Sequence, residues 1–166
     1  MSTKNLYSDE AKKKLKDIVE DISYTMMVTD LGNLPLSAIP MDTKKVDENG
    51  DIWFLSGADS DHNSDILKNG ATQLLYSGPG DKKFLSVYGN ATIVADDEII
   101  ADIYEKTDNA YLNGPDDPNT TAIRFTPKEA VYWDSDENTL KVLFKLAKAS
   151  VTGENQDIGT MGSLKM

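Results

Sequence analysis

The chain has 166 residues and a mass of 18.3 kDa, enough for one domain with its own core. Its 17 Lys and Arg and 28 Asp and Glu give a net charge of −11, which disfavours nucleic acids and anionic membranes as partners. The lack of cysteine excludes disulfides, thiol catalysis and Cys-ligated zinc, and any Ser-His-Asp triad would have to use His62, the only histidine. No apolar run approaches the ~20 residues that span a bilayer, and no secretory signal is recognisable, so we expect a cytoplasmic protein.

The first predicted element is an amphipathic helix over residues 9–22, with Ser8 as its N-cap. One apolar stripe runs along it at helical spacing, formed by Ala11, Leu15, Ile18, Val19 and Ile22. Three extended runs follow at 24–29, 34–46 and 52–56, the last two separated by a hairpin turn at 47–51. Pro35 and Pro40 interrupt the second run, which indicates an edge, bulged or ligand-facing strand, and we expect the three to form an antiparallel meander.

The middle of the chain predicts a short helix over 61–69, ended by Gly70, and then strands at 71–77 and 84–94. A second amphipathic helix begins at 96–98. Strands at 122–126 and 130–134 are expected to pair around a turn at Pro127–Glu129, and 140–146 is a final strand or helix. The apolar pattern thins from about Thr152, so the last residues are expected to be mobile or to lie on a partner. We therefore predict an α+β, mainly β, domain over 1–155 built on a barrel or strongly curled sheet, and a C-terminal tail over 156–166.

The densest polar cluster is Asp59–Asp65. It begins like a calcium loop, but Ser64 stands where that loop needs Gly and Gly70 where it needs a bidentate Glu, so we give calcium little weight. The alternative is a strand-to-helix corner, capped by Ser60 or Asp59, whose first-turn amides and His62 could bind an anion. A capped surface helix with an exposed histidine explains the same residues, and spacing alone favours it.

Two tryptophans, Trp53 and Trp133, lie in strand-like runs, and core packing is the more common place for both. Trp133 lies beside a predicted turn, which also allows a position at the barrel mouth, stacked on a flat ligand. Sequence alone leaves these two alternatives open.

Taken together, the segments resemble the general stress protein 26 group of the pyridoxamine 5′-phosphate oxidase-like, FMN-binding split-barrel superfamily. The resemblance covers roughly residues 8–155 and rests on an ordered set of stretches: Ser37–Met41, Asp47–Phe54, Asp59–Asn63, Leu85–Gly89, Gly114–Pro118, Thr126–Pro127, Val131–Asp134 and Phe144–Gly153. It implies a six-stranded antiparallel split β-barrel with flanking helices. It also implies a homodimer that binds FMN at its interface, with residues 34–46 nearby.

The resemblance also implies a set of cofactor-binding positions. These are Ile39, Pro40, Met41 and Lys44 on the second strand, Leu55 and Ser56 on the third, Ser60, Asp61, His62 and Asn63 at the corner, and Trp133. The superfamily has basic residues where this chain has Ile39, Ala58 and Asp61. Because a flavin phosphate prefers Arg or Lys, these departures predict that FMN is bound weakly or is absent as isolated.

The expected function is therefore that of a flavin-binding stress-response protein with a redox role, which does not use pyridoxamine phosphate as its substrate. If it is an enzyme, it is a flavin-dependent oxidoreductase, although no residue stands out as its acid or base. The alternatives are a non-catalytic flavin- or ligand-binding module, and a dimeric scaffold with a degenerate flavin site.

Overall fold

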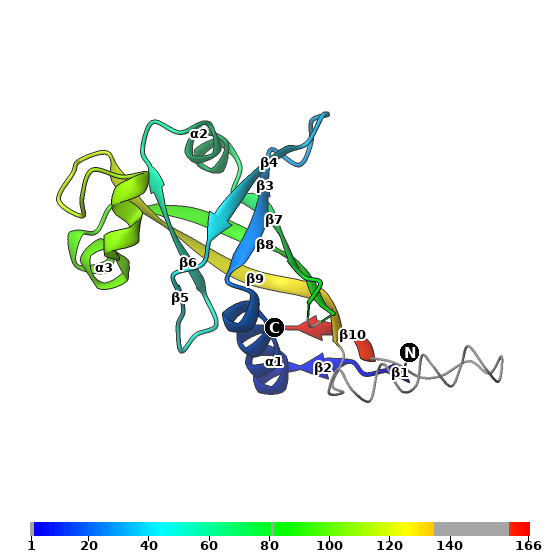
Figure 1. Cartoon of the computed structure of the whole chain (residues 1–166). Coiled ribbons are helices and arrows are strands. Elements are labelled where there is room, and N and C mark those ends of the chain that lie inside the picture. The colour runs from blue at the N-terminus through cyan, green and yellow to red at the C-terminus, as the bar shows by residue number, and fades with distance from the viewer. Residues whose placement is uncertain (1, 81, 135–159) are drawn as a thin grey trace.

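The computed structural model describes residues 2–80, 82–134 and 160–166 and contains a strongly curled sheet (Figure 1). Six strands form its main part in the order β4-β3-β7-β8-β9-β6, each antiparallel to its neighbours. They are β3 (Tyr24–Thr29), β4 (Ser37–Asp42), β6 (Ile52–Gly57), β7 (Ala71–Gly78), β8 (Lys83–Val94) and β9 (Thr120–Asp134). At the two ends of this order, β4 and β6 approach each other without pairing. The predicted six-stranded antiparallel split barrel is confirmed.

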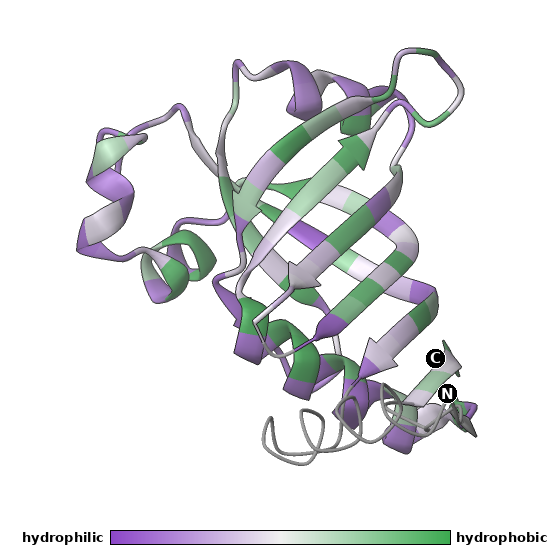
Figure 2. Ribbon diagram, turned by 45° about the vertical axis from the view of Figure 1, so that its right-hand side comes forward, coloured by the Kyte–Doolittle hydropathy of each residue, from purple (hydrophilic) through white to green (hydrophobic). Residues whose placement is uncertain are grey.

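The strands alternate between the barrel interior and the outside, as the period of a strand requires. In β6, Ile52 and Phe54 face the main core, whereas Trp53 and Leu55 belong to a second cluster on the outer side. Figure 2 shows hydrophobic and hydrophilic residues alternating along the strands, and hydrophobic turns of the N-terminal helix against the sheet. The sheet therefore carries apolar side chains on both faces, not only on the inner one.

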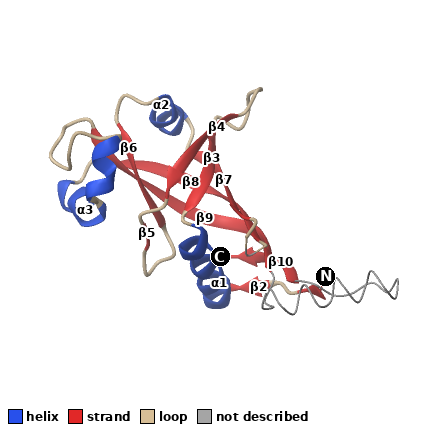
Figure 3. Ribbon diagram, viewed as in Figure 1, coloured by secondary structure: helices blue, strands red, loops and turns tan. Residues whose placement is uncertain are grey.

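In the described part of the chain, three α-helices flank the sheet (Figure 3): α1 (Ser8–Ile22), α2 (Asp61–Lys68) and α3 (Asp97–Ile103). The predicted helix over 9–22 is confirmed, and its Ala11, Leu15, Ile18 and Val19 are buried. The predicted cap at Ser8 is wrong, because Tyr7 is the N-cap residue and makes no side-chain hydrogen bond there. Figure 1 shows α1 and α2 at opposite ends of the curled sheet and α3 beside β6, followed by a 3₁₀ helix, η1 (Lys106–Ala110).

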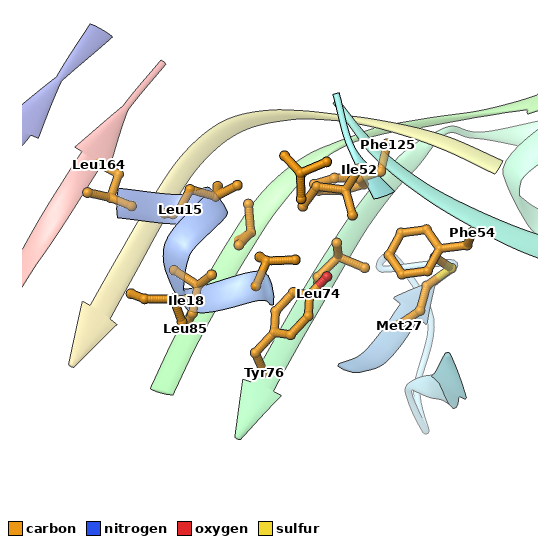
Figure 4. Packing of buried hydrophobic residues seen from close by; sticks show 14 of the residues in the cluster. Leu15, Ile18, Met27, Ile52, Phe54, Leu74, Tyr76, Leu85, Phe125 and Leu164 are labelled. Atoms are coloured by element: carbon orange, nitrogen blue, oxygen red, sulfur yellow. The ribbon is translucent and has the colours of Figure 1, made fainter. Parts of the chain in front are cut away.

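The main core fills the space between α1 and the sheet (Figure 4). Leu15 and Ile18 of α1 are almost completely buried in it together with Leu74, Leu85 and Phe125 of three different strands. A second, smaller cluster packs Ile100 and Ile103 of α3 on the outer side of β6. Burial of these side chains stabilises the fold by ~2 kcal/mol each. The packing of α1 on the sheet is therefore a main source of the stability of the fold.

The last predicted hairpin, at residues 122–134, is wrong. β9 is one continuous strand over Thr120–Asp134, and Pro127 does not begin a turn. The pairing of β8 and β9 shifts between Tyr88 and Gly89, which lie opposite Glu129 and Pro127, so Lys128 is the extra residue of a β-bulge. A bulge accommodates a residue without an N–H donor inside a long strand, and that is why the proline does not end β9.

The predicted meander is only partly formed. β3 pairs with β4, and the short β5 (Lys45–Val46), at the end of the predicted second run, pairs with β6, but β6 makes most of its pairs with β9. Gly70 follows Asn69, the C-cap of α2, as predicted. A Cβ there would lie 2.5 Å from the Ala91 carbonyl oxygen, so the close approach of β8, and not a left-handed conformation, requires the glycine.

The C-terminal residues that the structure describes form a strand of the sheet. β10 (Thr160–Lys165) pairs antiparallel with β9, and on its other side it pairs with β1 (Ser2–Thr3) and β2 (Leu6–Tyr7). The two ends of the chain therefore meet on one edge of the sheet. The element predicted at 140–146, the stretch Phe144–Gly153 and the boundary between 155 and 156 lie outside the described residues.

Candidate functional site

The corner between β6 and α2 is built as predicted. Ser60 is the N-cap of α2, and its Oγ accepts a hydrogen bond of 3.3 Å from the Asn63 amide. His62 Nε2 lies 3.1 Å from the same Ser60 Oγ. Because first-turn amides have no acceptor within their own helix, those of Asp61 and His62 are the donors that this corner can offer to an anion.

A buried polar network holds the corner from below. Ser56 Oγ donates to Asn63 Oδ1 at 2.8 Å, and Asn63 Nδ2 donates to Thr121 Oγ1 at 2.9 Å. All three side chains are buried, so Ser56 and Asn63 act as supports for α2 and do not face a ligand. Thr121 was not predicted, because its role depends on the pairing of β6 with β9, which local sequence does not reveal.

The charges around the corner are mostly negative. Asp61 is exposed in the first turn of α2, and Asp59 lies next to the cap, where Asn119 Nδ2 donates to it at 3.0 Å. Burial lowers the pKa of His62, and the nearby carboxylates of Asp65 and Asp61 oppose this shift without cancelling it. At neutral pH the imidazole is therefore neutral, and the residues of the corner from Asp59 to Asp65 contribute carboxylates and no cation.

Lys44, the cation expected for the phosphate, is already paired. Its Nζ lies 2.7 Å from Asp108, 2.8 Å from Asp42 and 3.5 Å from Glu105, and its side chain is only 3% exposed. Burial alone would lower the pKa of Lys44, but its hydrogen bonds to Asp108 and Asp42 outweigh burial and raise it. These three carboxylates were missed in the sequence, because two of them come from the distant η1 region.

The other predicted cofactor-binding residues, on β4 and β6, differ in their exposure to solvent. On β4, Met41 is buried and Ile39 half-buried, and both pack on the main core, whereas Pro40 is exposed on the outer face. On β6, Leu55 is buried in the cluster under α3. Of the predicted residues on β4 and β6, Ile39 and Pro40 are therefore the ones that remain at least partly accessible to a ligand.

Trp133 lies far from this corner within one chain. Gly57, which precedes the corner, pairs with Thr120 at the start of β9, whereas Trp133 lies near the other end of β9 opposite Phe84. At ~3.3 Å per residue, a straight strand would separate Thr120 and Trp133 by roughly 40 Å. Figure 1 shows the curled β9 running from the α2 end of the sheet to the β10 edge. Trp133 and the corner of the same chain therefore do not share one small ligand.

The outer face around Trp133 exposes several large apolar side chains, with the polar Gln73, Ser86 and Glu129 between them. It carries large side chains from four adjacent strands: Tyr24, Met26, Leu75, Phe84, Tyr88 and Val131. A hollow of about 240 Å³ lies on the same side, between β7, β8, β9 and β10, and Tyr88 and Val131 contribute to its walls. Large apolar side chains exposed on several adjacent strands are typical of a surface that another molecule covers.

These observations can be tested against the parts of an FMN molecule. The half-buried Trp133 and the apolar outer face suit the flat flavin ring. The corner does not suit the phosphate, because Lys44 is neutralised, His62 is held neutral and Asp61 is anionic. The described residues therefore fit a flavin ring but not the charge of its phosphate.

Solved structures of known proteins share this fold. Over 96% of this chain, it superposes on the whole of a general stress protein 26 from Jannaschia sp. CCS1, with a TM-score of 0.78 and 21% identity. The general stress FMN/FAD binding protein of Xanthomonas citri covers 79% of this chain with 93% of its own, at a TM-score of 0.66 and 21% identity. General stress protein 26 of Bacillus anthracis covers 73% with 92% of its own, at 0.64 and 21%.

Comparison at the level of sequence gives the family. No curated protein matches the chain. In the described part of the chain, no helix is both long and apolar enough to cross a membrane. The sequence profile described as "Pyridoxamine 5'-phosphate oxidase like" matches residues 10–157, which is most of the chain. The chain therefore belongs to the pyridoxamine 5′-phosphate oxidase-like family.

Proposed function

We propose that the protein is a flavin-binding stress-response protein that works as a homodimer and has a redox role. Each flavin site would combine the corner at Ser60–Asn63 and the accessible residues of β4 in one protomer with Trp133 of the other. The observation that carries this proposal is the position of Trp133, which the length of β9 separates from the corner of its own chain. In a two-fold dimer, Trp133 of the partner can lie at the corner that Trp133 of the same chain does not reach.

The apolar outer face supports the dimer. Met26, Leu75 and Val131 follow one line across β3, β7, β8 and β9, with Ser86 between the last two, and all three are partly exposed. Pro40 continues this line on β4, within the segment 34–46 that we expect near the interface. Covering this face with a second copy removes apolar surface from water, at about 25 cal/mol for each Å².

The names of two similar structures support a flavin as the ligand. The protein from Xanthomonas citri is described as FMN/FAD binding, and one from Nostoc punctiforme, of 12% identity and TM-score 0.53, as FMN binding. A bound flavin would supply electron transfer, while Trp133 of this chain would stack on the ring and limit the access of water. If the protein is an enzyme, it is a flavin-dependent oxidoreductase.

The paired state of Lys44 favours a second candidate, a dimeric scaffold that binds no flavin. One pair of measurements separates the two: the visible spectrum of the purified protein after incubation with FMN or riboflavin and gel filtration, and its sedimentation at micromolar concentration. A dimer that retains the absorption bands of oxidised flavin is expected. A colourless dimer would leave only the scaffold, and a monomer would contradict the shared site.

A further inference from the structure

The electrostatics of the corner define the ligand more narrowly than flavins as a class. Every flavin has the same ring, but FMN adds a phosphate with a charge close to −2, whereas riboflavin ends in a hydroxyl group. The cation expected to bind the phosphate, Lys44, is 3% exposed and faces Asp42, Glu105 and Asp108. Its single positive charge is therefore outnumbered by its own partners.

The helix end of the corner is no better suited to a phosphate. The exposed carboxylate of Asp61 already lies in the first turn of α2, where it interacts favourably with the helix dipole. Asp59 and Asp65 lie on either side, held by Asn119 and by Thr29, whose Oγ1 donates to Asp65 at 2.9 Å. A phosphate at the first-turn amides would meet this carboxylate charge at short range.

The chain's single arginine does not compensate the negative charge of the corner. Arg124 lies in the middle of β9, opposite Trp53 on β6 and Thr92 on β8, and its side chain is exposed. Thr120, at the start of the same strand, is the residue that pairs next to the corner. The amides of Asp61 and His62 remain, and they can serve a neutral hydroxyl group as well as an anion.

We infer that the site selects a flavin without a phosphate, of the riboflavin type, which it holds by the ring and not by ionic contacts. This inference rests on the flavin-binding function proposed above. Because a charge pair at ~4 Å is worth about 1 kcal/mol in water, we expect FMN to bind about five-fold more weakly than riboflavin at low salt.

The test is a fluorescence titration of the purified protein with riboflavin and with FMN, at low salt and at high salt. The variant is Asp61→Asn, and the matched control is Asp9→Asn, which removes another exposed first-turn acid but from α1, at the opposite end of the sheet. Salt and Asp61→Asn should each bring the FMN affinity up to that of riboflavin, because both reduce the repulsion. Asp9→Asn should leave the ratio of the two affinities unchanged.

The outcomes are separable. Tighter binding of FMN than of riboflavin by the unchanged protein would overturn the inference and leave the flavin-binding function intact. So would a ratio that Asp61→Asn does not alter. If neither flavin binds under any of these conditions, the proposed function fails and the inference fails with it.

Discussion

Lys44 Nζ lies 2.7 Å from Asp108 Oδ1, so this ion pair connects the segment between β4 and β5 to η1. Asp108 also accepts the backbone N–H of Glu105 through its second oxygen, at 2.8 Å, so both its oxygens are occupied. Lys45, the next residue, pairs with Asp102 of α3 on the surface, at 2.7 Å. Adjacent lysines thus hold the α3–η1 segment, one in a buried pair and one in an exposed pair.

We expect Lys44→Met to destabilise the protein by about 3 kcal/mol, because removing one partner of a buried pair leaves Asp108 uncompensated. Lys45→Met is the matched control and should have a much smaller effect, since exposed pairs contribute little. Urea unfolding of both variants measures the difference. Equal losses of unfolding free energy would show that burial of the Lys44 pair is energetically unimportant.

The same pair predicts a pH dependence. Burial alone would lower the pKa of Lys44, but its hydrogen bonds to Asp108 and Asp42 raise it above the unfolded value. The stabilisation is therefore fully present below the unfolded pKa of about 10.4 and is lost as pH rises through the folded pKa. We therefore expect the difference in unfolding free energy between the wild type and Lys44→Met to shrink as pH rises above about 10.4. A difference that stays constant above that pH would argue against the ion pair.

His62 gives a titration that can be assigned without ambiguity, because the chain has only one histidine. Burial lowers its pKa, so the NMR midpoint of the imidazole should lie below the ordinary 6.5. The group therefore contributes stability above its unfolded pKa, and this contribution is lost as pH falls through the folded pKa. Asp65→Asn should lower the midpoint further, because that carboxylate favours the charged imidazole; a rise would contradict the assigned cause.

The two tryptophans provide a matched pair for the proposed flavin site. Trp133→Ala should weaken flavin binding by about ten-fold while it lowers stability by ~1 kcal/mol, because the side chain is half-buried on the outer face. Trp53 is buried, and its Nε1 donates to Asp47 at 2.9 Å, so Trp53→Ala should cost about 3–5 kcal/mol of stability. Flavin titration and thermal unfolding of both variants decide between ligand contact and core packing for Trp133.

The bulge in β9 predicts a contrast between two glycines. A Cβ at Gly89 would lie 2.3 Å from the Thr126 carbonyl oxygen and 2.6 Å from the ring of Phe125, whereas one at Gly80 would meet nothing within 4 Å. Gly89→Ala should therefore destabilise the protein by about 1–3 kcal/mol, as overpacking does, and Gly80→Ala by much less. A well-tolerated Gly89→Ala would mean that β8 and β9 can separate at the bulge without cost.

Local sequence was sufficient for the elements whose signal is periodic or lies in a few adjacent residues. The apolar stripe of α1, the cap of α2 at Ser60 and the hairpin turn at Asp47–Asp51 all appear in the structure where they were predicted. The family resemblance added the six-stranded antiparallel split barrel, which local patterns do not contain. These features depend on residues that are close in sequence, or on a fold that related chains share.

What could not be predicted depends on residues that are distant in sequence. Pro127 resembles a turn residue locally, but pairing with β8 places it opposite Gly89 beside a bulge, and the strand continues. Lys44 resembles a free cation for a phosphate, but the packing of η1 surrounds it with carboxylates. In both cases the neighbours come from a remote part of the chain, so the conformation and the charge state follow from the fold and not from the local residues.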